Sequence, residues 1–533
     1  MGIPLPDVDA TPTVNAGLSQ TMARRGFLFR AAAAGMMAVA APSLLAACEQ
    51  VVDPTATPTN KPFPTPTPFS RPTATPTLAA TATPIPAPTA TPRPVLKTEA
   101  ARVSHLLRRA SFGASMAELA GAREVGLQAT IDDLVDYDSV DDGALDARLA
   151  ALETNIERQG SVQLWWLNRM AYTKRPLQEK MTLFWHGILT SSFAKTGGSP
   201  AMYEQNELFR RMGMGRYDEM LKAISRDAAM LIYLDSRTNR KASPNENYSR
   251  ELMELFTLGI GQYTEDDVRE AARAFTGWQI KGKTEFLFNE QQHDFGDKTF
   301  LGQTGQWDGD DVVDIIMQQP AAGEYIVRRL WEFFAYADPE PEVVARLARV
   351  FDDNETRIRP VMRAMFESEE FYSARAFQAL IKGPAELVAS TVRTLGIDTT
   401  FSSVRRGIDA MGQSLLAPPD VSGWDGGVAW INSSTLLARV NLAHTIASGG
   451  SRQLAFDPTA LAGAAGESSE TLVGFYVDLL LGGEITDATR AALLEHAEEL
   501  RIPSRTTGRT VPFEERVRSV VYLILASPDH QLA

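Results

Sequence analysis

Residues 264–275 read TEDDVREAARAF, and this stretch indicates most directly what kind of fold the chain adopts. Thr264 followed three positions later by Asp267 is the pattern of a helix capping box, with Asp in place of the usual Glu or Gln. The apolar residues that follow recur at i, i+3, i+4 and i+7, which is the spacing of one face of an α-helix. They are Val268, Ala271, Ala272 and Phe275. The stretch therefore predicts an amphipathic helix that buries one face.

The same spacing recurs along most of the chain from about Lys97 onward. Ser115 and Glu118 repeat the capping-box pattern, and apolar residues at helical spacing continue as far as residues 517–525. Strand-like alternation is nearly absent and is clearest in Thr284–Phe288. We therefore predict a mainly α, multi-helical globular body with at most a small β-hairpin near residues 284–300.

The first 47 residues have the features of an export signal. Two adjacent arginines, Arg24 and Arg25, precede a short apolar run at Ala31–Ala41, and small residues lead up to Cys48. The order resembles a twin-arginine signal followed by a lipobox; a Sec-type signal with a chance pair of arginines is the alternative. The apolar run is too short for a permanent membrane span. A lipid on Cys48 would anchor the chain, so we expect an exported cell-envelope protein on the outer face of the cytoplasmic membrane or on the outer membrane.

The next segment, residues 48–96, is dominated by Pro and Thr, as in PFPTPTP at 62–68. Such a composition cannot bury a core and favours extended polyproline II structure, so we interpret the segment as a disordered stalk. The folded body follows it. We divide the body into a helical core, residues 97–449, and a C-terminal helical part, residues 450–533.

The composition excludes several classes of function. The chain has 533 residues, with 52 Lys and Arg against 66 Asp and Glu, and a net charge of −14. That charge argues against a nucleic-acid partner, which requires a basic face. The single cysteine rules out intramolecular disulfides and metal sites built on several thiolates. A metal bound by this chain would therefore need His, Asp, Glu or Asn ligands.

Residues 245–259, NENYSRELMELFTLG, contain the strongest candidate for a functional site. On an ideal α-helix of about 100° per residue, four polar side chains share one face. They are Asn247, Arg250, Glu251 and Glu254. Two carboxylates one turn apart can share a proton or a metal ion, and an adjacent arginine can neutralise or orient an anionic group. An ordinary solvated face is the alternative, because Arg250 has i,i+4 spacing to both Glu246 and Glu254.

Further candidates lie outside this helix. His186 falls in an apolar helix, where a core role competes with a ligand or acid–base role. His293 and Asp294 fall in a loop, where a metal or catalytic role competes with a structural hydrogen-bond network. A proline-stiffened loop presents Asp420 and Trp424, and it either stacks on a ligand or partner or covers the helical core.

Together these segments resemble the DUF1800 family. The matching motifs are RRASFG at 108–113, FWH at 184–186, the helix at 245–259, FTGW at 275–278, HDFGDK at 293–298 and PPDVSGW at 418–424. The family is of unknown function, so the resemblance implies no reaction. It implies export in many members and frequent occurrence beside exported DUF1501 proteins, which resemble sulfatases. Within these motifs Asn245 and Trp278 join Asp294, Asp420 and Trp424 as candidate binding residues.

The sequence departs from the family at one position. Many members read Phe-Trp-His-Asn-His-Phe, whereas here His186 is followed by Gly187 and Ile188. The second imidazole of that motif is missing, so the resemblance does not support a paired-histidine metal site at this point.

Two functions of different classes fit these features. The first is an exported hydrolase of an envelope or extracellular polymer, metal-assisted or working by carboxylate acid–base catalysis. Its candidate catalytic residues are Glu251, Glu254, Arg250, Asn247, His186 and His293. A divalent metal is the candidate cofactor, with Glu251, Glu254 and His293 as its candidate ligands. The second is a non-catalytic binding or assembly protein that works with a co-exported DUF1501-type partner and uses the Trp424 loop as its interface.

Overall fold

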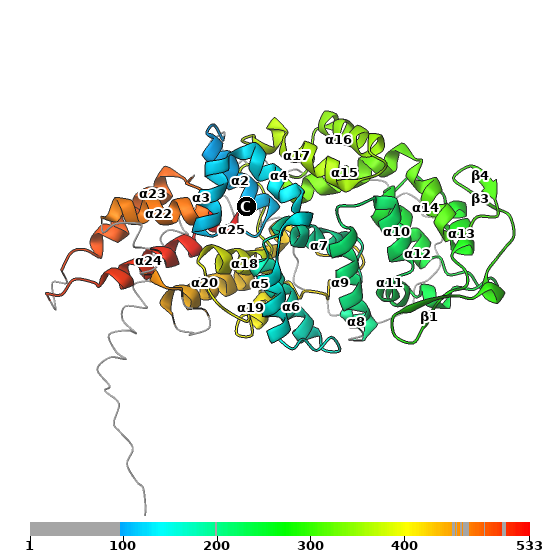
Figure 1. Ribbon diagram of the computed structural model, residues 1–533, viewed down its shortest axis with the longest axis horizontal. Helices are drawn as coiled ribbons and strands as arrows, with labels where there is room; N and C mark the ends of the chain where they lie inside the picture. The colour runs from blue at the N-terminus through cyan, green and yellow to red at the C-terminus, as the bar shows by residue number, and fades with distance from the viewer. Residues whose placement is uncertain are drawn as a thin grey trace, which may run out of the picture. The chain divides into compact units, whose positions relative to one another are not determined.

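A computed structural model describes residues 96–197, 200–449, 468–483, 485–503 and 508–533, and a few positions between 454 and 461. Helices dominate this part of the chain, so the prediction of a mainly α fold is confirmed (Figure 1). The predicted export signal, Cys48 and all but one residue of the predicted stalk lie outside the described residues. The exception is Leu96, which is buried in the core and so belongs to the folded body.

The first helices of the body cover residues 99–212. They are α2 (Glu99–Ala110), α3 (Met116–Val125), α4 (Leu127–Val135), the 3-10 turn η1 (Tyr137–Ser139), α5 (Gly143–Ala151), α6 (Gln159–Tyr172), α7 (Pro176–Ile188), α8 (Phe193–Thr196) and α9 (Ala201–Met212). The capping box predicted at Ser115 and Glu118 is present at the start of α3. Helix α7 packs against α9, and α2 packs against α3, α4 and α7.

The middle of the chain combines short helices with two hairpins. Its elements are α10 (Tyr217–Ser225), α11 (Ala228–Tyr233), η2 (Ser236–Thr238), α12 (Asn247–Glu251), the π-helix η3 (Leu252–Thr257), α13 (Glu265–Ala274), β1 (Trp278–Lys281), β2 (Glu285–Phe288), η4 (Glu290–Gln292), β3 (Lys298–Phe300) and β4 (Gln303–Gly305). The opening stretch of the sequence forms α13 with the predicted capping box at Thr264. Its four periodic apolar residues are all buried.

The two hairpins hold all the paired strands among the described residues. Strand β1 pairs antiparallel with β2, with Trp278 opposite Phe288, and β3 pairs antiparallel with β4. The sequence predicted at most one hairpin near 284–300, whereas the first hairpin begins earlier and the second ends later. The second is closed by Leu301 and Gly302, which both have positive φ values, 45° and 80°. This is the backbone that a tight two-residue hairpin turn requires.

The remaining helices complete the body. They are α14 (Gly309–Met317), α15 (Pro320–Phe334), α16 (Pro341–Asp353), α17 (Ile358–Phe366), η5 (Glu369–Tyr372), α18 (Pro384–Thr394), α19 (Arg405–Ala410), η6 (Gly427–Trp430), α20 (Ser433–Ser448), α22 (Ser469–Leu481), α23 (Asp487–Glu499), α24 (Phe513–Ala526) and α25 (Pro528–Gln531). Proline stands at the first position of α15, α16, α18 and α25, where its missing N–H has no intrahelical partner to lose.

The C-terminal helices pack onto the rest of the body. Helix α24 lies against α20, and the N–H of Lys382 donates to the carbonyl oxygen of Gln531 at 2.9 Å. Residues Arg93–Ala533 accordingly form one compact unit. In the part of the chain that the structure describes, none of the helices has the length and apolar character needed to cross a membrane.

A single apolar cluster extends from Leu96 to Phe377 and fixes the helices that carry the candidate site. Trp185 of α7 is fully buried within it and stacks on Tyr217 of α10, with 5.3 Å between the ring centroids. Its indole N–H donates to the carbonyl oxygen of Gly213 at 2.8 Å. This contact holds α7 and α10 at a fixed separation, and both helices lead into the candidate site.

Candidate functional site

The stretch predicted as one α-helix over 245–259 is α12 followed directly by a π-helix. In a π-helix each backbone N–H bonds to the carbonyl oxygen five residues earlier. The N–H of Leu258 accordingly donates to the oxygen of Met253 at 2.8 Å. Continuous α-helical geometry is therefore wrong beyond Glu251. π-Helical turns are rare and are frequent at functional sites.

Two tyrosines from neighbouring helices hold the π-helix in place. Tyr217 of α10 is fully buried and donates its hydroxyl to the carbonyl oxygen of Phe256. Tyr325 of α15 donates its hydroxyl to the carbonyl oxygen of Leu255 at 2.6 Å. Buried carbonyls need hydrogen-bond partners, so these hydroxyls stabilise the wider turn.

Of the two carboxylates at i,i+4 spacing from Arg250, Glu246 pairs with it, but the closest contacts of Arg250 are with Glu265. Its guanidinium binds both carboxylate oxygens of Glu265, at 2.8 Å each, and reaches Glu246 at 3.3 Å. The hydrogen bond from Arg250 lowers the pKa of Glu265. Arg250 therefore links α12 to the first turn of α13, and its part in the site is to hold these helices together.

The two glutamates of the stripe have different surroundings. Glu254 accepts a hydrogen bond from the hydroxyl of Tyr263 at 2.9 Å. Glu251 is half-buried, and burial followed by the charge of Glu254 raises its pKa, with Arg250 acting in the opposite direction. Two neighbouring carboxylates whose environments differ can take different protonation states, as an acid and a base must.

Asp420 shares an electrostatic environment with Glu251 through Tyr233, the last residue of α11. Burial raises the pKa of the Tyr233 phenol, and the charges of Asp420 and Glu251 raise it further. The phenol therefore lies within electrostatic range of both carboxylates, although Asp420 is 169 positions beyond Glu251 in the sequence. The structure thus joins the loop of Asp420 to the polar helix, two features that the sequence presented separately.

A tight turn fixes the shape of that loop. The carboxylate of Asp420 accepts hydrogen bonds from the N–H of Ser422 at 2.9 Å and from its hydroxyl at 2.6 Å. Gly423 has a φ of +90° and lies so close to α7 that an added Cβ would stand 2.4 Å from the carbonyl oxygen of Gly187. Only glycine fits this approach, and it places the next residue, Trp424, against α7.

Trp424 meets His186 edge-on, with 5.4 Å between the ring centroids. On its other side His186 makes a similar contact with Trp166, at 5.5 Å. His186 is buried, and its Nε2 has no hydrogen-bond partner among the described residues. Burial lowers its pKa to about 3, so the imidazole is neutral at ordinary pH. Trp424 itself is only half-buried, so it lies between the buried imidazole that it contacts and the surface of the loop.

His293 and Asp294 belong to a different network. His293 is buried between Phe288 and Phe295, and its Nδ1 lies 2.8 Å from the carbonyl oxygen of Thr276. The carboxylate of Asp294 accepts from Nε of Arg273 at 2.7 Å, which lowers its pKa. These bonds tie the loop to α13 and β1, so the loop-tying alternative describes the observed contacts.

Trp278 is buried in the core and is not exposed to solvent. Its ring meets Phe275 and Phe286 edge-on at 5.0 and 5.3 Å, and the guanidinium of Arg226 lies 4.7 Å from its centroid. This is an aromatic contact of the core. The expectation that Trp278 faces a ligand does not fit a side chain that is 4% exposed.

The two candidate asparagines shape the chain that enters α12. The N–H of Asn247 donates to the side-chain oxygen of Asn245 at 3.0 Å, and the N–H of Asn245 donates to the side-chain oxygen of Asn239 at 2.9 Å. Asn239 is buried and also donates to the carbonyl oxygen of Ala272 at 2.8 Å. Asn245 and Asn247 thus set the start of the polar helix, and Asn247 keeps an exposed side chain beside it.

The structure divides the predicted site into two groups. Glu251, Glu254 and Asp420 lie in one electrostatic environment, and Trp424 with His186 adjoins them through the same loop. His293 belongs to the other group, with Asp294. Among the described residues no three His, Cys, Asp or Glu side chains are grouped so that they could hold a metal ion. The predicted ligand set of Glu251, Glu254 and His293 is therefore not assembled.

Sequence reasoning missed Tyr233 and Tyr263, which contact or face the carboxylates. Tyr263 directly precedes Thr264, the capping residue of α13, and follows the polar helix by one short loop. This position could have predicted that Tyr263 lies close to Glu254. No local pattern marks Tyr233, since its relation to Asp420 depends on the fold.

A family model described as "Protein of unknown function (DUF1800)" matches residues 105–532. No curated protein and no solved structure matches the chain. The matched range contains every element that contributes to the candidate site.

Proposed function

The chain belongs to the DUF1800 family, and since that family has no assigned function, we propose from the site itself that the protein is a hydrolase working by carboxylate acid–base catalysis. In this proposal Glu251 is the general acid and Asp420 the general base. Asp420 removes a proton from a water molecule that attacks the scissile bond, and Glu251 gives its proton to the departing oxygen. The proton gained by Asp420 then returns to Glu251 through solvent, which restores both groups.

One observation carries the proposal. Glu251 is a half-buried carboxylate with a raised pKa, and both it and the exposed carboxylate of Asp420 lie within electrostatic range of the phenol of Tyr233. A raised pKa keeps a carboxyl protonated closer to neutral pH, which is what a general acid needs. Carboxyl groups with a raised pKa are enriched at catalytic sites.

The surrounding residues support this assignment. Glu254 lies beside Glu251 and its charge favours the protonated form of Glu251. Tyr263 holds Glu254 by a hydrogen bond. The π-helix sets the direction in which Glu254 leaves the helix, and the tyrosines behind it keep that direction fixed. Trp424 offers a half-exposed ring next to Asp420, suited to stacking on a sugar ring of a polymer.

We propose further that the hydrolase acts outside the cytoplasm. The twin-arginine-like signal and the lipobox before Cys48 support export and attachment to a membrane by a lipid. The Pro/Thr-rich segment that follows supports a stalk between the anchor and the body. An anchored enzyme on a stalk is suited to an envelope or extracellular polymer as substrate.

The test compares Glu251→Gln with Glu246→Gln in the full chain. Both residues lie at the same helix, but Glu246 only touches Arg250 at 3.3 Å. We expect Glu251→Gln to lower hydrolysis of polysaccharides and chromogenic glycosides or esters by about 100-fold or more, since general acid catalysis contributes on the order of 10²–10⁴. Glu246→Gln should retain activity. If wild type hydrolyses a substrate and folded Glu251→Gln hydrolyses it at the same rate, the assignment of Glu251 as the general acid is contradicted.

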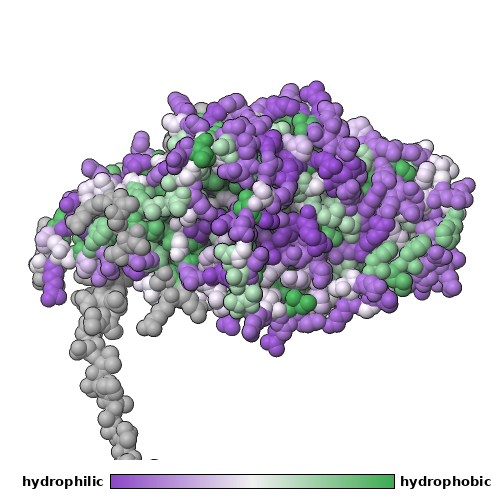
Figure 2. Space-filling model, viewed as in Figure 1, coloured by the Kyte–Doolittle hydropathy of each residue, from purple (hydrophilic) through white to green (hydrophobic). Residues whose placement is uncertain are grey.

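A non-catalytic binding function is the second candidate, and an exposed apolar surface favours it. Leu287 and Phe288 of β2 and Phe295 in the next loop are 40, 39 and 59% exposed. Figure 2 shows hydrophobic side chains on the surface around the β1–β2 hairpin. Exposed apolar groups of this kind suit a protein partner, for which a co-exported DUF1501-type protein is the candidate.

Co-purification distinguishes the two functions. If the protein binds such a partner through this surface, Phe295→Ser should abolish co-purification while leaving the melting temperature unchanged. Loss of the complex in Trp424→Ala but not in Phe295→Ser would instead place the interface at the loop next to α7. An intact complex in both variants would count against this second function.

A further inference from the structure

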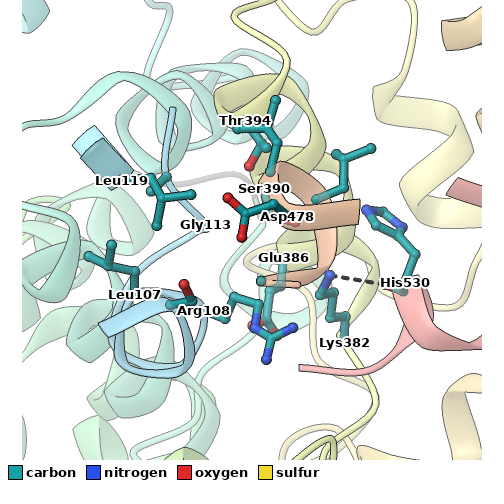
Figure 3. Close-up of a pocket in the computed structure, with 15 residues that line it drawn as sticks. Leu107, Arg108, Gly113, Leu119, Lys382, Glu386, Ser390, Thr394, Asp478 and His530 are labelled. Atoms are coloured by element: carbon teal, nitrogen blue, oxygen red, sulfur yellow. Dashed lines mark hydrogen bonds between the residues drawn. The ribbon is translucent and has the colours of Figure 1, made fainter. Parts of the chain in front are cut away.

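A groove lies at the end of α11, where η2 and the first hairpin meet. Its volume is about 430 Å³, which is within the range of pockets that bind ligands. The cavity in Figure 3, where Nζ of Lys382 donates to the carbonyl oxygen of His530, holds only about 30 Å³. That smaller volume admits a water-sized group. Of the two, the groove at α11 therefore has room for a segment of a ligand.

Residues from α11, η2 and the first hairpin line this groove. They are Ile232, Arg237, Gln279, Ile280, Gly282 and Lys283. Helix α11 packs against β1, and Figure 1 shows the two in the same part of the body. Arg237, Gly282 and Lys283 are exposed, so the groove is open to solvent. An open groove suits a stretch of an extended chain better than a small molecule, which a pocket usually encloses.

The segments that form the groove are basic although the chain is acidic. Residues 236–244 and 278–283 contain no Asp or Glu and five exposed basic residues, namely Arg237, Arg240, Lys241, Lys281 and Lys283. The whole chain has a net charge of −14. A local group of cations attracts anionic ligands even where the net charge of the chain opposes them. The groove is therefore suited to a ligand with negative charges.

Two of these five cations have an acidic partner. Nζ of Lys283 lies 2.6 Å from Glu157, and Nζ of Lys281 lies 3.6 Å from Glu285. All four side chains are at least 50% exposed. Ion pairs at such exposed positions are screened by water and contribute little free energy. An anionic ligand can therefore compete with either carboxylate.

The other three cations make no ion pair among the described residues. They are Arg237, Arg240 and Lys241. The acidic residues that bound their segment have other partners, since Asp235 pairs with Lys195 at 2.6 Å and Glu246 pairs with Arg250 at 3.3 Å. The positive charge of the segment is thus left for a ligand to neutralise. The planar guanidinium of Arg237 can bind two oxygens of one carboxylate or sulfate group.

Hydrogen bonds hold this basic segment in a fixed position. The N–H of Lys241 donates to the carbonyl oxygen of Gln292 at 2.8 Å, and the N–H of Gly277 donates to that of Asn239 at 3.0 Å. Both bonds join the segment to the chain around the first hairpin. A ligand that binds here does not need to order the backbone first, which would reduce its affinity.

The uncharged lining of the groove suits a sugar chain. Ile232 and Ile280 are half-buried aliphatic side chains that can pack against the C–H face of a sugar ring. The side-chain oxygen of Gln279 accepts from Nδ2 of Asn289 at 3.3 Å, whereas its amide N–H groups make no hydrogen bond among the described residues. These N–H groups can donate to a sugar hydroxyl. None of the described lining residues is aromatic, although aromatic rings are what hold the bases of single-stranded nucleic acids.

The groove adjoins the proposed catalytic carboxylates. Ile232 lines it, and the phenol of the next residue, Tyr233, lies within electrostatic range of Glu251 and Asp420. Successive residues of a helix differ in direction by about 100°. The end of α11 can therefore present Ile232 to the groove and Tyr233 to the carboxylates. A chain seated in the groove would pass next to the proposed site.

We propose that this groove binds the anionic groups of an acidic polysaccharide through Arg237, Lys283 and the other cations of the same two segments. These groups are carboxylates or sulfates, which both match the paired donors of a guanidinium. That the polysaccharide is also the substrate rests on the proposed function, whereas its binding in the groove does not. The groove shares no residue with the proposed catalytic group, so the two can fail separately.

Binding of soluble polymers to the full chain tests the groove. Polygalacturonate supplies carboxylates, dextran sulfate supplies sulfates, and unmodified dextran is the neutral control. In titration calorimetry we expect saturable binding of at least one acidic polymer, weakened by added salt because salt screens exposed charges. Dextran should not bind measurably. Equal binding of dextran, or no saturable binding of either acidic polymer, would overturn the proposal. Tighter binding of single-stranded DNA than of both acidic polymers would overturn it in favour of a nucleic acid.

Two variants and a control assign the binding to the groove. Arg237→Gln and Lys283→Gln should each weaken binding by about three- to tenfold, because each removes one charged contact at an exposed position. Arg349→Gln is the control and should bind as wild type does. Arg349 is also exposed, makes no ion pair among the described residues, and lies on α16, which Figure 1 shows well away from β1. Unchanged affinity in both groove variants would overturn the proposal.

A catalytic variant separates this proposal from the proposed function. Glu251→Gln should bind the acidic polymer as tightly as wild type, because Glu251 does not line the groove. If wild type binds the polymer through Arg237 without hydrolysing it, the proposed function fails and the groove stands. If wild type hydrolyses it, Arg237→Gln should raise KM more than it lowers kcat, as expected for lost binding. Hydrolysis with the same KM in wild type and Arg237→Gln would overturn the groove and leave the proposed function in place.

Discussion

The hydroxyl of Tyr217 donates a hydrogen bond to the carbonyl oxygen of Phe256, in the π-helix that follows Glu251. The tyrosine is fully buried and stacks on Trp185 of α7. A single side chain thus connects the core tryptophan to the backbone of the polar helix. The geometry of the candidate site therefore depends on packing behind it as well as on the residues that face solvent.

Replacing Tyr217 by Phe should destabilise the protein. The change leaves the Phe256 carbonyl without its buried donor, which costs on the order of 1–3 kcal/mol. Urea unfolding measures the loss. Tyr263→Phe is the comparison, since its hydroxyl binds Glu254 on a half-exposed face. Equal stability of Tyr217→Phe and wild type would show that the π-helix does not need this bond.

The pH dependence of hydrolysis should identify Glu251 as the acid. A general acid must be protonated, so activity falls as pH rises through its raised pKa. In Glu254→Gln the negative charge that helps to raise this pKa is gone. The falling limb of the pH–rate profile should then move to lower pH. A limb that stays in place would mean that another group limits the rate at high pH.

The same shift has a consequence for stability. Because the pKa of Glu251 is higher in the folded than in the unfolded chain, the folded state binds more protons between the two values. Stability contributed at low pH is therefore lost as pH rises through that window. In Glu251→Gln the free energy of unfolding should no longer fall over this pH range. Urea unfolding curves recorded at acidic and at neutral pH measure this difference. A pH slope that is the same in the variant and wild type would refute the assignment.

Buried neutral histidines should make the fold sensitive to acid. The pKa of His186 is lowered to about 3 from an ordinary value of 6.5, so the unfolded chain takes up a proton that the folded chain does not. Its stabilising effect is full above pH 6.5 and is lost as pH falls below that value, at about 1.4 kcal/mol per pH unit. His186→Gln should reduce the slope of stability against pH. His444→Gln, at an exposed position, is the matched control.

A methyl group at Gly423 should displace the Asp420 loop. The Cβ of Gly423→Ala would stand 2.4 Å from the Gly187 carbonyl oxygen at a φ of +90°. We expect a loss of stability of about 1–3 kcal/mol together with a change in the fluorescence of Trp424. Gly427→Ala shares a positive φ but has open space around the new atom. Because both glycines have a positive φ, the difference between the two variants measures the steric clash alone, without the backbone strain. Unchanged stability and fluorescence in Gly423→Ala would contradict the close contact.

Local signals in the sequence were sufficient for most of the helices. The capping box at Thr264 and the apolar period after it predicted α13 correctly, because both depend on residues within one or two turns. The π-helix could not be predicted in this way. It is stabilised by hydroxyl groups of Tyr217 and Tyr325, which lie 39 and 70 positions from the carbonyls they bind.

The candidate site was predictable only in part, for the same reason. Glu251 and Glu254 were found because they are neighbours on one element. Of the two i,i+4 partners that the sequence offered Arg250, Glu246 is observed, whereas its closest contact, with Glu265, could not be predicted because α13 brings that carboxylate to it. The relation of Asp420 to Glu251 depends on where the loop crosses α7, and no periodicity carries that information.

The contact between Gly423 and Gly187 also constrains how the sequence can vary. An added Cβ at Gly187 would meet no atom of another part of the fold within 4 Å, so this position has room for a side chain. At Gly423 the obstacle is a backbone oxygen, which no substitution at position 187 can remove. The structure thus leaves room for a side chain at position 187 but not at position 423, and a larger residue at 187 would adjoin His186 without displacing the loop.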